Sequence, residues 1–132
     1  MARDASKAWS VELHPDFEPE FAKLSADVQD NLLAGAKAIS LAGPKAGRPH
    51  VDTLAGSKHA NMKELRFENN SGSEIWRAAF AFDPERKAII LVAGAKQGQS
   101  EARFYKQLIA VADKRFDGHL QDIQDRRRPR SK

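Results

Sequence analysis

The sequence of this 132-residue chain predicts an α+β fold, in which a small, mostly antiparallel sheet packs against an N-terminal helical hairpin and a C-terminal helix. Two observations predict this class. Three strand-like segments follow one another between residues 62 and 95, with turn-forming residues in both short connections. Segments whose apolar residues recur at helical spacing lie before and after these strands.

A short strand and two helices are expected first. Residues 9–13 (WSVEL) alternate apolar and polar side chains, as a strand does. A short helix should run through Phe17, Phe21 and Leu24, and Ser25 should cap a longer helix that ends at Gly43. The apolar residues at helical spacing in this longer helix are Val28, Leu32, Leu33, Ala36, Ile39 and Ala42.

Residues 45–61 (KAGRPHVDTLAGSKHAN) have neither helical nor strand periodicity and are rich in glycine, basic residues and histidine. We expect a long connection in which only Val51 and Leu54 reach the core. Connections of this length commonly carry function or move.

The segments 62–68 (MKELRFE), 73–82 (SEIWRAAFAF) and 88–95 (AIILVAGA) predict an antiparallel meander. The last is apolar at every position from residue 88 to 93, so both its faces should be covered. Ser100 and Glu101 should begin a final helix. Asp117 and Gly118 should weaken that helix, and the residues beyond should fray.

The composition, 41% hydrophobic and 30% charged, is that of an ordinary globular protein. We expect one domain over residues 1–125 and a disordered basic tail over residues 126–132 (RRRPRSK). No apolar run is long enough to cross a bilayer, and residues 1–10 lack the core of a signal peptide, so a cytoplasmic protein without membrane contact is expected. The absence of cysteine excludes disulfides and thiolate catalysis.

The net charge of +4 is unevenly distributed. Residues 43–106 carry eleven basic and seven acidic side chains, and the tail alone adds five basic ones. A terminal basic run is usually a solvated tail, and the alternative is non-specific contact with nucleic acid.

Strand parity places a group of charged side chains on one face, because successive residues point to opposite faces. The aromatic face of segment 73–82 should be core, and its residues are Trp76, Phe80 and Phe82. Arg77 therefore points to the opposite face. In segment 62–68 Leu65 and Phe67 take the core side, which places Glu64 and Arg66 beside Arg77.

This face has two interpretations. The simpler one is a surface ladder of ion pairs, formed by Glu64, Glu68, Arg66 and Arg77. The other is a phosphodiester site, because the end of segment 88–95 and the start of the final helix can bring Lys96 and Tyr105 to the same face. Tyr105 also fits the edge of the helix's apolar stripe.

No metal or cofactor is expected. The histidines lack metal-ligand spacing, and the glycine-containing loops lack P-loop spacing. His50 and His59 lie in the long basic connection, where histidines are most often solvated, with proton transfer or phosphate contact as the alternative.

The order and spacing of several segments resemble the RelE/HigB toxins of type II toxin–antitoxin modules, particularly the phage-type HigB branch. The segments are GRPHVDTLAGSKHANMKELRF, WRAAFAFDPERKAIILVAGAKQGQSEARFY and ADKRFDGHL, and the resemblance covers residues 11–120. It implies a RelE/ParE-like fold and a ribonuclease that cleaves messenger RNA, commonly on the ribosome, by attack of the 2′-hydroxyl on the adjacent phosphate, without metal or cofactor. The implied partners are a cognate antitoxin, expected to be of the helix-turn-helix type, the ribosome and messenger RNA.

The resemblance also implies roles for residues. The catalytic candidates are Glu64, Arg77, Lys96 and Tyr105; the candidates for binding RNA or phosphate are Arg66, Arg103, Lys63, His59 and Arg48. Arg77 matches the arginine that contacts the scissile phosphate. RelE has lysines where this chain has Met62 and Glu64, so the general base is open. We rank Glu64 slightly ahead of Tyr105, a ranking that fails if Glu64 merely pairs with Arg66 or Arg77.

Two other functions remain open. One is a ParE-like toxin that binds DNA gyrase without catalysis, against which Arg77, Lys96 and Tyr105 argue. The other is a phage-derived binding module of the same fold that has lost activity.

Overall fold

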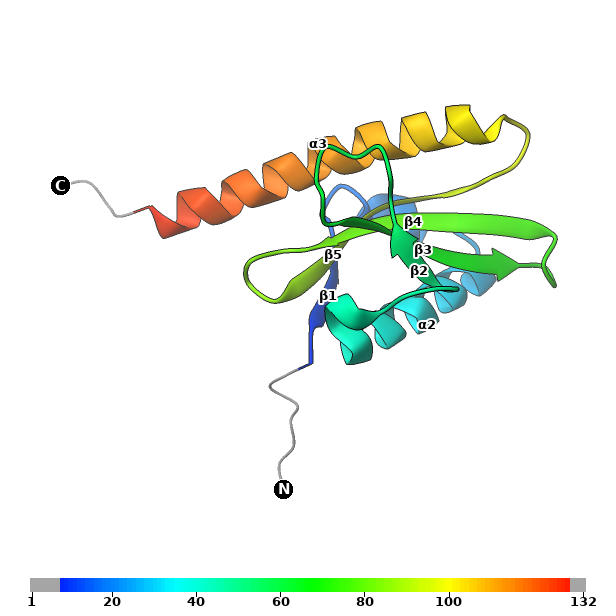
Figure 1. Ribbon diagram of the computed structural model, residues 1–132. Helices are drawn as coiled ribbons and strands as arrows, with labels where there is room; N and C mark the ends of the chain where they lie inside the picture. The colour runs from blue at the N-terminus through cyan, green and yellow to red at the C-terminus, as the bar shows by residue number, and fades with distance from the viewer. Residues whose placement is uncertain (1–7, 129–132) are drawn as a thin grey trace, which may run out of the picture.

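The computed structural model describes residues 8–128, which form a five-stranded mixed sheet with helices on both faces (Figure 1). The elements in chain order are β1 (Ser10–Leu13), α1 (Glu18–Ala22), α2 (Ala26–Ala42), the 3-10 turn η2 (Gly43–Lys45), β2 (Val51–Thr53), β3 (Met62–Asn69), β4 (Glu74–Phe82), β5 (Lys87–Ala95) and α3 (Glu101–Arg127). The sheet order is β1-β5-β4-β3-β2. The predicted α+β class is confirmed.

The expected meander is present as β3, β4 and β5, paired antiparallel in sequence order. The first strand joins it from the other end of the chain, because β1 pairs in parallel with β5 from Ser10↔Lys87 to Leu13↔Ile90. One parallel pair makes the sheet mixed, within the mostly antiparallel arrangement predicted from the sequence.

A short strand interrupts the connection that was expected to have no regular structure. Val51–Thr53 forms β2, which pairs antiparallel with Leu65, Glu64 and Lys63 of β3. The expected contacts with the core hold, since Val51 and Leu54 are both buried. This strand is an edge of the sheet, and it brings the connection against the face that carries Glu64.

The longer helix of the hairpin begins and ends where the sequence indicated. The Ser25 hydroxyl accepts a hydrogen bond from the Val28 backbone N–H at 3.2 Å, which is the expected N-cap. Gly43 ends α2 with a φ of +61°, and a Cβ at this residue would lie 2.6 Å from the ring of Trp9. Both the backbone conformation and the close approach of Trp9 therefore require glycine.

Helices cover both faces of the sheet, as the uniformly apolar β5 requires. On one face α2 packs over a core that includes Leu65, Phe80 and Ile90. On the other face α3 packs over residues that include Ala79 and Leu91. The Arg77 side of β4 is thus the side that α3 covers, and the small alanines let the helix lie close.

The prediction that the last helix weakens at Asp117 and Gly118 is wrong. Helix α3 continues to Arg127, because contacts from distant parts of the chain hold its second half. Asp117 pairs with Lys58 at 2.6 Å, and Ile123 is buried. No helix in residues 8–128 is long and apolar enough to cross a membrane.

The basic segment predicted as a disordered tail begins inside α3. Arg126 and Arg127 lie in its last turn, and each approaches Glu85 of the β4–β5 turn, at 3.6 and 3.4 Å. Residues 129–132, the remainder of the predicted tail, lie outside the described residues.

Candidate active site

Glu64 lies at the centre of a network of polar contacts between β3, β4 and α3. Its side chain is only 5% exposed. Oε1 accepts a hydrogen bond from the Tyr105 hydroxyl at 2.7 Å, and Oε2 accepts from Arg66, whose Nε and Nη2 both lie 3.1 Å away. A buried carboxylate is costly unless it is paired and hydrogen-bonded, and here both oxygens are satisfied.

Two guanidinium groups face each other across the sheet. Arg66 and Arg77 are direct partners in the β3–β4 register, a position where like charges are destabilising. Glu64 offsets this repulsion, because its Oε1 also lies 3.6 Å from Arg77 Nε. One carboxylate thus serves two arginines, and a positive charge is left over at this pair.

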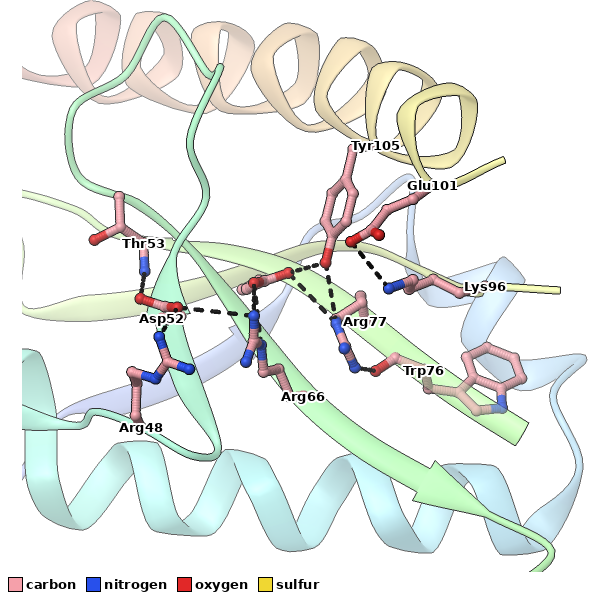
Figure 2. A network of polar contacts seen from close by, with 10 residues as sticks. Arg48, Asp52, Thr53, Arg66, Trp76, Arg77, Lys96, Glu101 and Tyr105 are labelled. Atoms are coloured by element: carbon pink, nitrogen blue, oxygen red, sulfur yellow. Dashed lines mark hydrogen bonds and ion pairs between the residues drawn. The ribbon is translucent and has the colours of Figure 1, made fainter. Parts of the chain in front are cut away.

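Tyr105 connects α3 to the two strands beneath it (Figure 2). Its hydroxyl donates to Glu64 and accepts from Arg77 Nε at 3.1 Å. Burial raises the pKa of the Tyr105 hydroxyl, and the hydrogen bond to Glu64 adds to this, while Arg77 opposes it. Tyr105 is therefore a neutral hydrogen-bond donor at neutral pH.

Lys96 stands at the end of β5, on the α3 side of the network. Its ammonium pairs with Glu101 at 3.2 Å and lies 5.5 Å from the centre of the Tyr105 ring. The lysine side chain is 19% exposed, so it is partly desolvated between the strand end and the first turn of the helix. The end of β5 and the first turn of α3 thus lie beside the arginine-bearing face through Lys96 and Tyr105, whereas Arg103 of the same turn is exposed.

Asp52 of β2 extends the network toward solvent. Its Oδ2 lies 3.7 Å from Arg66 and 3.4 Å from Arg48, whose side chain is 73% exposed (Figure 2). The network so far holds four basic side chains, Arg48, Arg66, Arg77 and Lys96, and three acidic ones, Asp52, Glu64 and Glu101. It has an excess of positive charge.

A pocket of about 480 Å³ opens beside the two facing arginines. Its lining is Pro49, His50, Arg66, Phe67, Glu68, Ile75 and Arg77. Planar guanidinium groups match the geometry of phosphate oxygens and bind them in bidentate fashion. The pocket can therefore receive a phosphate group from the solvent side.

Asp52 and Glu101 belong to the network although the sequence reasoning did not select them. For Asp52 the signal was present in the buried Val51 beside it, because alternation in a strand places Asp52 on the face of Glu64. For Glu101 the signal was its spacing of four residues from Tyr105, which puts both on one side of a helix.

Three of the predicted RNA-binding residues lie apart from this network. Arg103 is exposed and lies about 200° around α3 from Tyr105, at about 100° per residue. Lys63 alternates to the opposite face of β3 from Glu64. His59 contacts Asp117 at 2.8 Å, which is about 18 Å farther along α3 than Tyr105 at about 1.5 Å per residue.

Glu64 pairs with Arg66 and approaches Arg77, and it also accepts a hydrogen bond from Tyr105, so it does more than pair with the arginines. Its ranking slightly ahead of Tyr105 as the general base stays a prediction. The short hydrogen bond joins Glu64 and Tyr105 into one unit. Because Glu64 is buried, the face is also more than a solvent-exposed ladder of ion pairs.

The fold and the site define a class of small α+β proteins with a basic, tyrosine-bearing sheet face beside the last helix. A solved structure with this fold is that of the free Escherichia coli toxin RelE carrying two arginine-to-alanine substitutions, with a TM-score of 0.54 and 14% sequence identity, covering 78% of this chain and 95% of that one. Residues 19–117 match the family model described as "Phage derived protein Gp49-like (DUF891)". The chain belongs to this Gp49-like family of HigB/RelE-type toxins.

Two relatives from Mycobacterium tuberculosis support the same assignment. The chain is 40% identical over 109 residues to "Putative toxin HigB2" and 39% identical over 111 residues to "Putative toxin HigB3". The alignments cover 83% and 84% of this chain. The chain spans about half the length of the first relative, 53%, and 93% of the second. Both relatives are described as putative toxins of the HigB type.

Proposed function

We propose that the chain is an endoribonuclease that cleaves messenger RNA on the ribosome by attack of a ribose 2′-hydroxyl on the adjacent phosphate. The observation that carries this proposal is the convergence of Arg77, Tyr105 and Glu64 on one side of the sheet. Each of the three side chains has a polar atom within 3.6 Å of a polar atom of each of the other two. These groups are an electrophilic stabiliser, a hydroxyl and a proton acceptor, which the reaction needs at neighbouring positions.

Arg77 stabilises the negative charge that develops on the phosphate. Its Nη1 donates to the Trp76 carbonyl at 3.0 Å, which holds one end of the guanidinium, while Nε donates to the Tyr105 hydroxyl until substrate arrives. Arg66 adds a second positive charge beside it. Preorganised donors directed at developing charge commonly lower a barrier by about 3–4 kcal/mol each.

The proton of the attacking hydroxyl moves through Tyr105 to Glu64. When Arg77 turns to the phosphate, the Tyr105 oxygen is free to accept the 2′-hydroxyl proton while its own proton passes to Glu64 Oε1 over the existing hydrogen bond. The 2′-oxygen bonds to phosphorus, the bond to the 5′-oxygen breaks, and Lys96 protonates that oxygen. The products are a 2′,3′-cyclic phosphate and a 5′-hydroxyl.

The remaining basic residues bind RNA farther from the scissile phosphate. Arg48 is exposed at the outer end of the network and reaches the backbone of a strand entering the pocket. Arg103, Lys63 and His59 lie away from the pocket, so their contacts would add affinity rather than act on the reacting atoms.

The test is to express the chain briefly in bacterial cells and map the 5′ ends of messenger RNA. New ends should appear within translated frames, and Arg77→Ala and Tyr105→Phe should each reduce them by about 100-fold or more. Lys114→Ala is the matched control, since it removes an exposed basic residue of α3 outside the network.

Cuts that persist in Arg77→Ala would overturn the proposed role of the site. Growth arrest with intact messages would overturn ribonuclease activity as a whole, and supercoiling defects in the same cells would then indicate gyrase as the target.

A further inference from the structure

An apolar groove of about 450 Å³ lies between α2 and the edge of the sheet, and of the residues of the catalytic network only Arg66 lines it. Its aliphatic walls include Ala34, Gly35, Ala38 and Ile39 of α2, Val51 of β2 and Leu65 of β3. Strand β2 has only three residues and pairs with β3 as far as Leu65. Farther along β3, the backbone N–H of Arg66 donates to the His50 carbonyl, and the Glu68 carbonyl accepts from the Asn31 side chain of α2. The groove lies along this side, between α2 and the edge formed by β2 and β3.

The sequence of α2 keeps the groove deep. A Cβ at Gly35 would lie 2.7 Å from a methyl carbon of Leu65, so glycine lets Leu65 pack directly against the helix backbone and form the floor. Alanines at 34 and 38 keep the wall low. A larger residue at position 35 would displace Leu65 and change the shape of the groove.

The outward face of α2 beside the groove is also apolar. Between Asn31 and Ala42 the helix carries one charged residue, Lys37, and Leu41 is 76% exposed. The solvent side of a surface helix is normally polar, and a continuous exposed apolar surface indicates an interaction site. Leu41 is three residues from the groove-lining Ala38, so its exposed apolar side chain adjoins the groove on the helix surface.

One end of the groove adjoins the catalytic pocket. His50, Arg66, Phe67 and Glu68 line both. At this shared wall Arg66 is 29% exposed, and its contact with Asp52, at 3.7 Å, is long for an ion pair. A carboxylate brought along the groove could therefore pair with Arg66 in place of Asp52.

We propose that the groove binds an apolar segment of the cognate antitoxin, whose acidic residue at one end pairs with Arg66 and closes the catalytic pocket. The occupant is a protein and not RNA, because most lining residues are aliphatic or glycine and the ring-bearing ones, His50 and Phe67, lie only at the wall shared with the catalytic pocket, whereas nucleobases bind on aromatic side chains. The proposal rests on the membership of the toxin class, which implies an antitoxin, and not on the ribonuclease activity. It makes neutralisation a consequence of occupying the wall that the two cavities share.

The experiment measures binding of the purified chain to the purified antitoxin of its own module by titration calorimetry. Ala34→Glu and Ala38→Glu place a charge in the groove at exposed helix positions, where the fold is spared. Each should raise the Kd for the antitoxin by at least about tenfold. Ala26→Glu is the control, because Ala26 is an exposed alanine at the start of α2, outside the apolar stretch 31–42, and does not line the groove; this variant should bind as the unaltered chain does.

A second arm tests the acidic contact. Arg66→Ala should weaken binding at low salt more than at high salt, because an ion pair at a partly exposed arginine is screened. Circular dichroism of each variant establishes that it is folded before its affinity is compared.

Three results would overturn the proposal. Unchanged affinity in the groove variants would place the antitoxin elsewhere. Loss of messenger RNA cleavage by the free variants with antitoxin binding intact would assign the groove to RNA. A change in the molar mass of the chain alone, measured by light scattering, would assign it to a second copy. The calorimetric result stands even if the chain cleaves no RNA, so failure here is distinct from failure of the proposed function.

Discussion

At the scale of single residues, the site depends on one buried carboxylate, that of Glu64, which three side chains approach and to which two of them donate hydrogen bonds. Glu64 accepts from Tyr105 and Arg66, while Arg77 approaches the oxygen that Tyr105 already uses. Arg77 therefore makes its hydrogen bonds to Tyr105 and to the Trp76 backbone carbonyl. The pKa of the Tyr105 hydroxyl depends on its contacts with both Glu64 and Arg77.

Tyr105 is the only tyrosine in the sequence, so its titration can be read directly from phenolate absorbance. The folded protein should titrate above the ordinary value of 10.0, because burial and the contact with Glu64 disfavour the phenolate and raise its pKa. In denaturant the pKa should return to about 10. Glu64→Gln should lower the folded pKa, and Arg77→Ala should raise it further.

The same titration has a consequence for stability. Because the pKa of Tyr105 is raised in the folded state, its protonated hydroxyl stabilises the fold below pH 10, and this stability is lost as the pH rises through the folded pKa. The unaltered chain should therefore lose stability relative to Tyr105→Phe above about pH 10. A folded tyrosine that titrates at its ordinary value would contradict the hydrogen bond to Glu64.

At the scale of elements, local sequence pattern was sufficient where the environment is set by alternation or capping. Parity placed Glu64, Arg66 and Arg77 on one face, and Ser25 marked the start of α2. Local sequence pattern was insufficient where contacts with residues far away in the chain determine the structure. Strand β2 has only three residues, so its one signal, the alternation of buried Val51 with Asp52, could not place Asp52 beside Glu64 without the pairing of β2 with β3.

The second half of α3 is another case in which tertiary contacts override local propensity. Gly118 lowers helix propensity, yet the buried side chain of Asp83 accepts from His119 at 2.7 Å and holds the helix one residue farther on. Asp83 lies 36 residues earlier in the chain, so no local pattern could reveal this contact.

Asp83→Ala should therefore destabilise two elements together. Asp83 also accepts from the backbone N–H groups of Glu85 and Lys87, at 2.8 and 2.9 Å, in the β4–β5 turn. Loss of a fully buried acceptor should lower the free energy of unfolding by about 2–3 kcal/mol. Hydrogen exchange should accelerate both in this turn and around His119.

Asp125→Ala is the control for Asp83→Ala, since Asp125 is an exposed aspartate of α3, the helix that Asp83 contacts through His119. If both variants unfold at the same denaturant concentration, the Asp83–His119 contact does not hold α3.

At the scale of the whole molecule, the site is complete only when α3 is docked on the sheet, because Tyr105 comes from α3 and its partners come from β3 and β4. Arg115 is one of the residues that dock it. The guanidinium donates to both oxygens of Glu20 in α1, at 3.0 and 2.6 Å, and to the Leu91 carbonyl of β5 at 2.7 Å. It therefore joins the first helix, the sheet and the last helix.

Arg115→Ala and Glu20→Gln should differ in both size and pH dependence. Arg115→Ala leaves the Leu91 carbonyl without its donor and should cost about 1–2 kcal/mol of stability. Glu20 is half exposed, so Glu20→Gln should cost at most about 0.5 kcal/mol of stability.

The two variants also differ in pH dependence. The hydrogen bond from Arg115 lowers the pKa of Glu20. The stability that the Glu20 carboxylate contributes is therefore present above the ordinary pKa of 4.5 and is lost as the pH falls through the lower, folded pKa. Denaturant unfolding of the unaltered chain and Glu20→Gln should show their stabilities converging below pH 4.5, whereas Arg115→Ala should stay less stable than both, because the Leu91 contact does not titrate. Convergence of all three would mean that Arg115 acts only through Glu20.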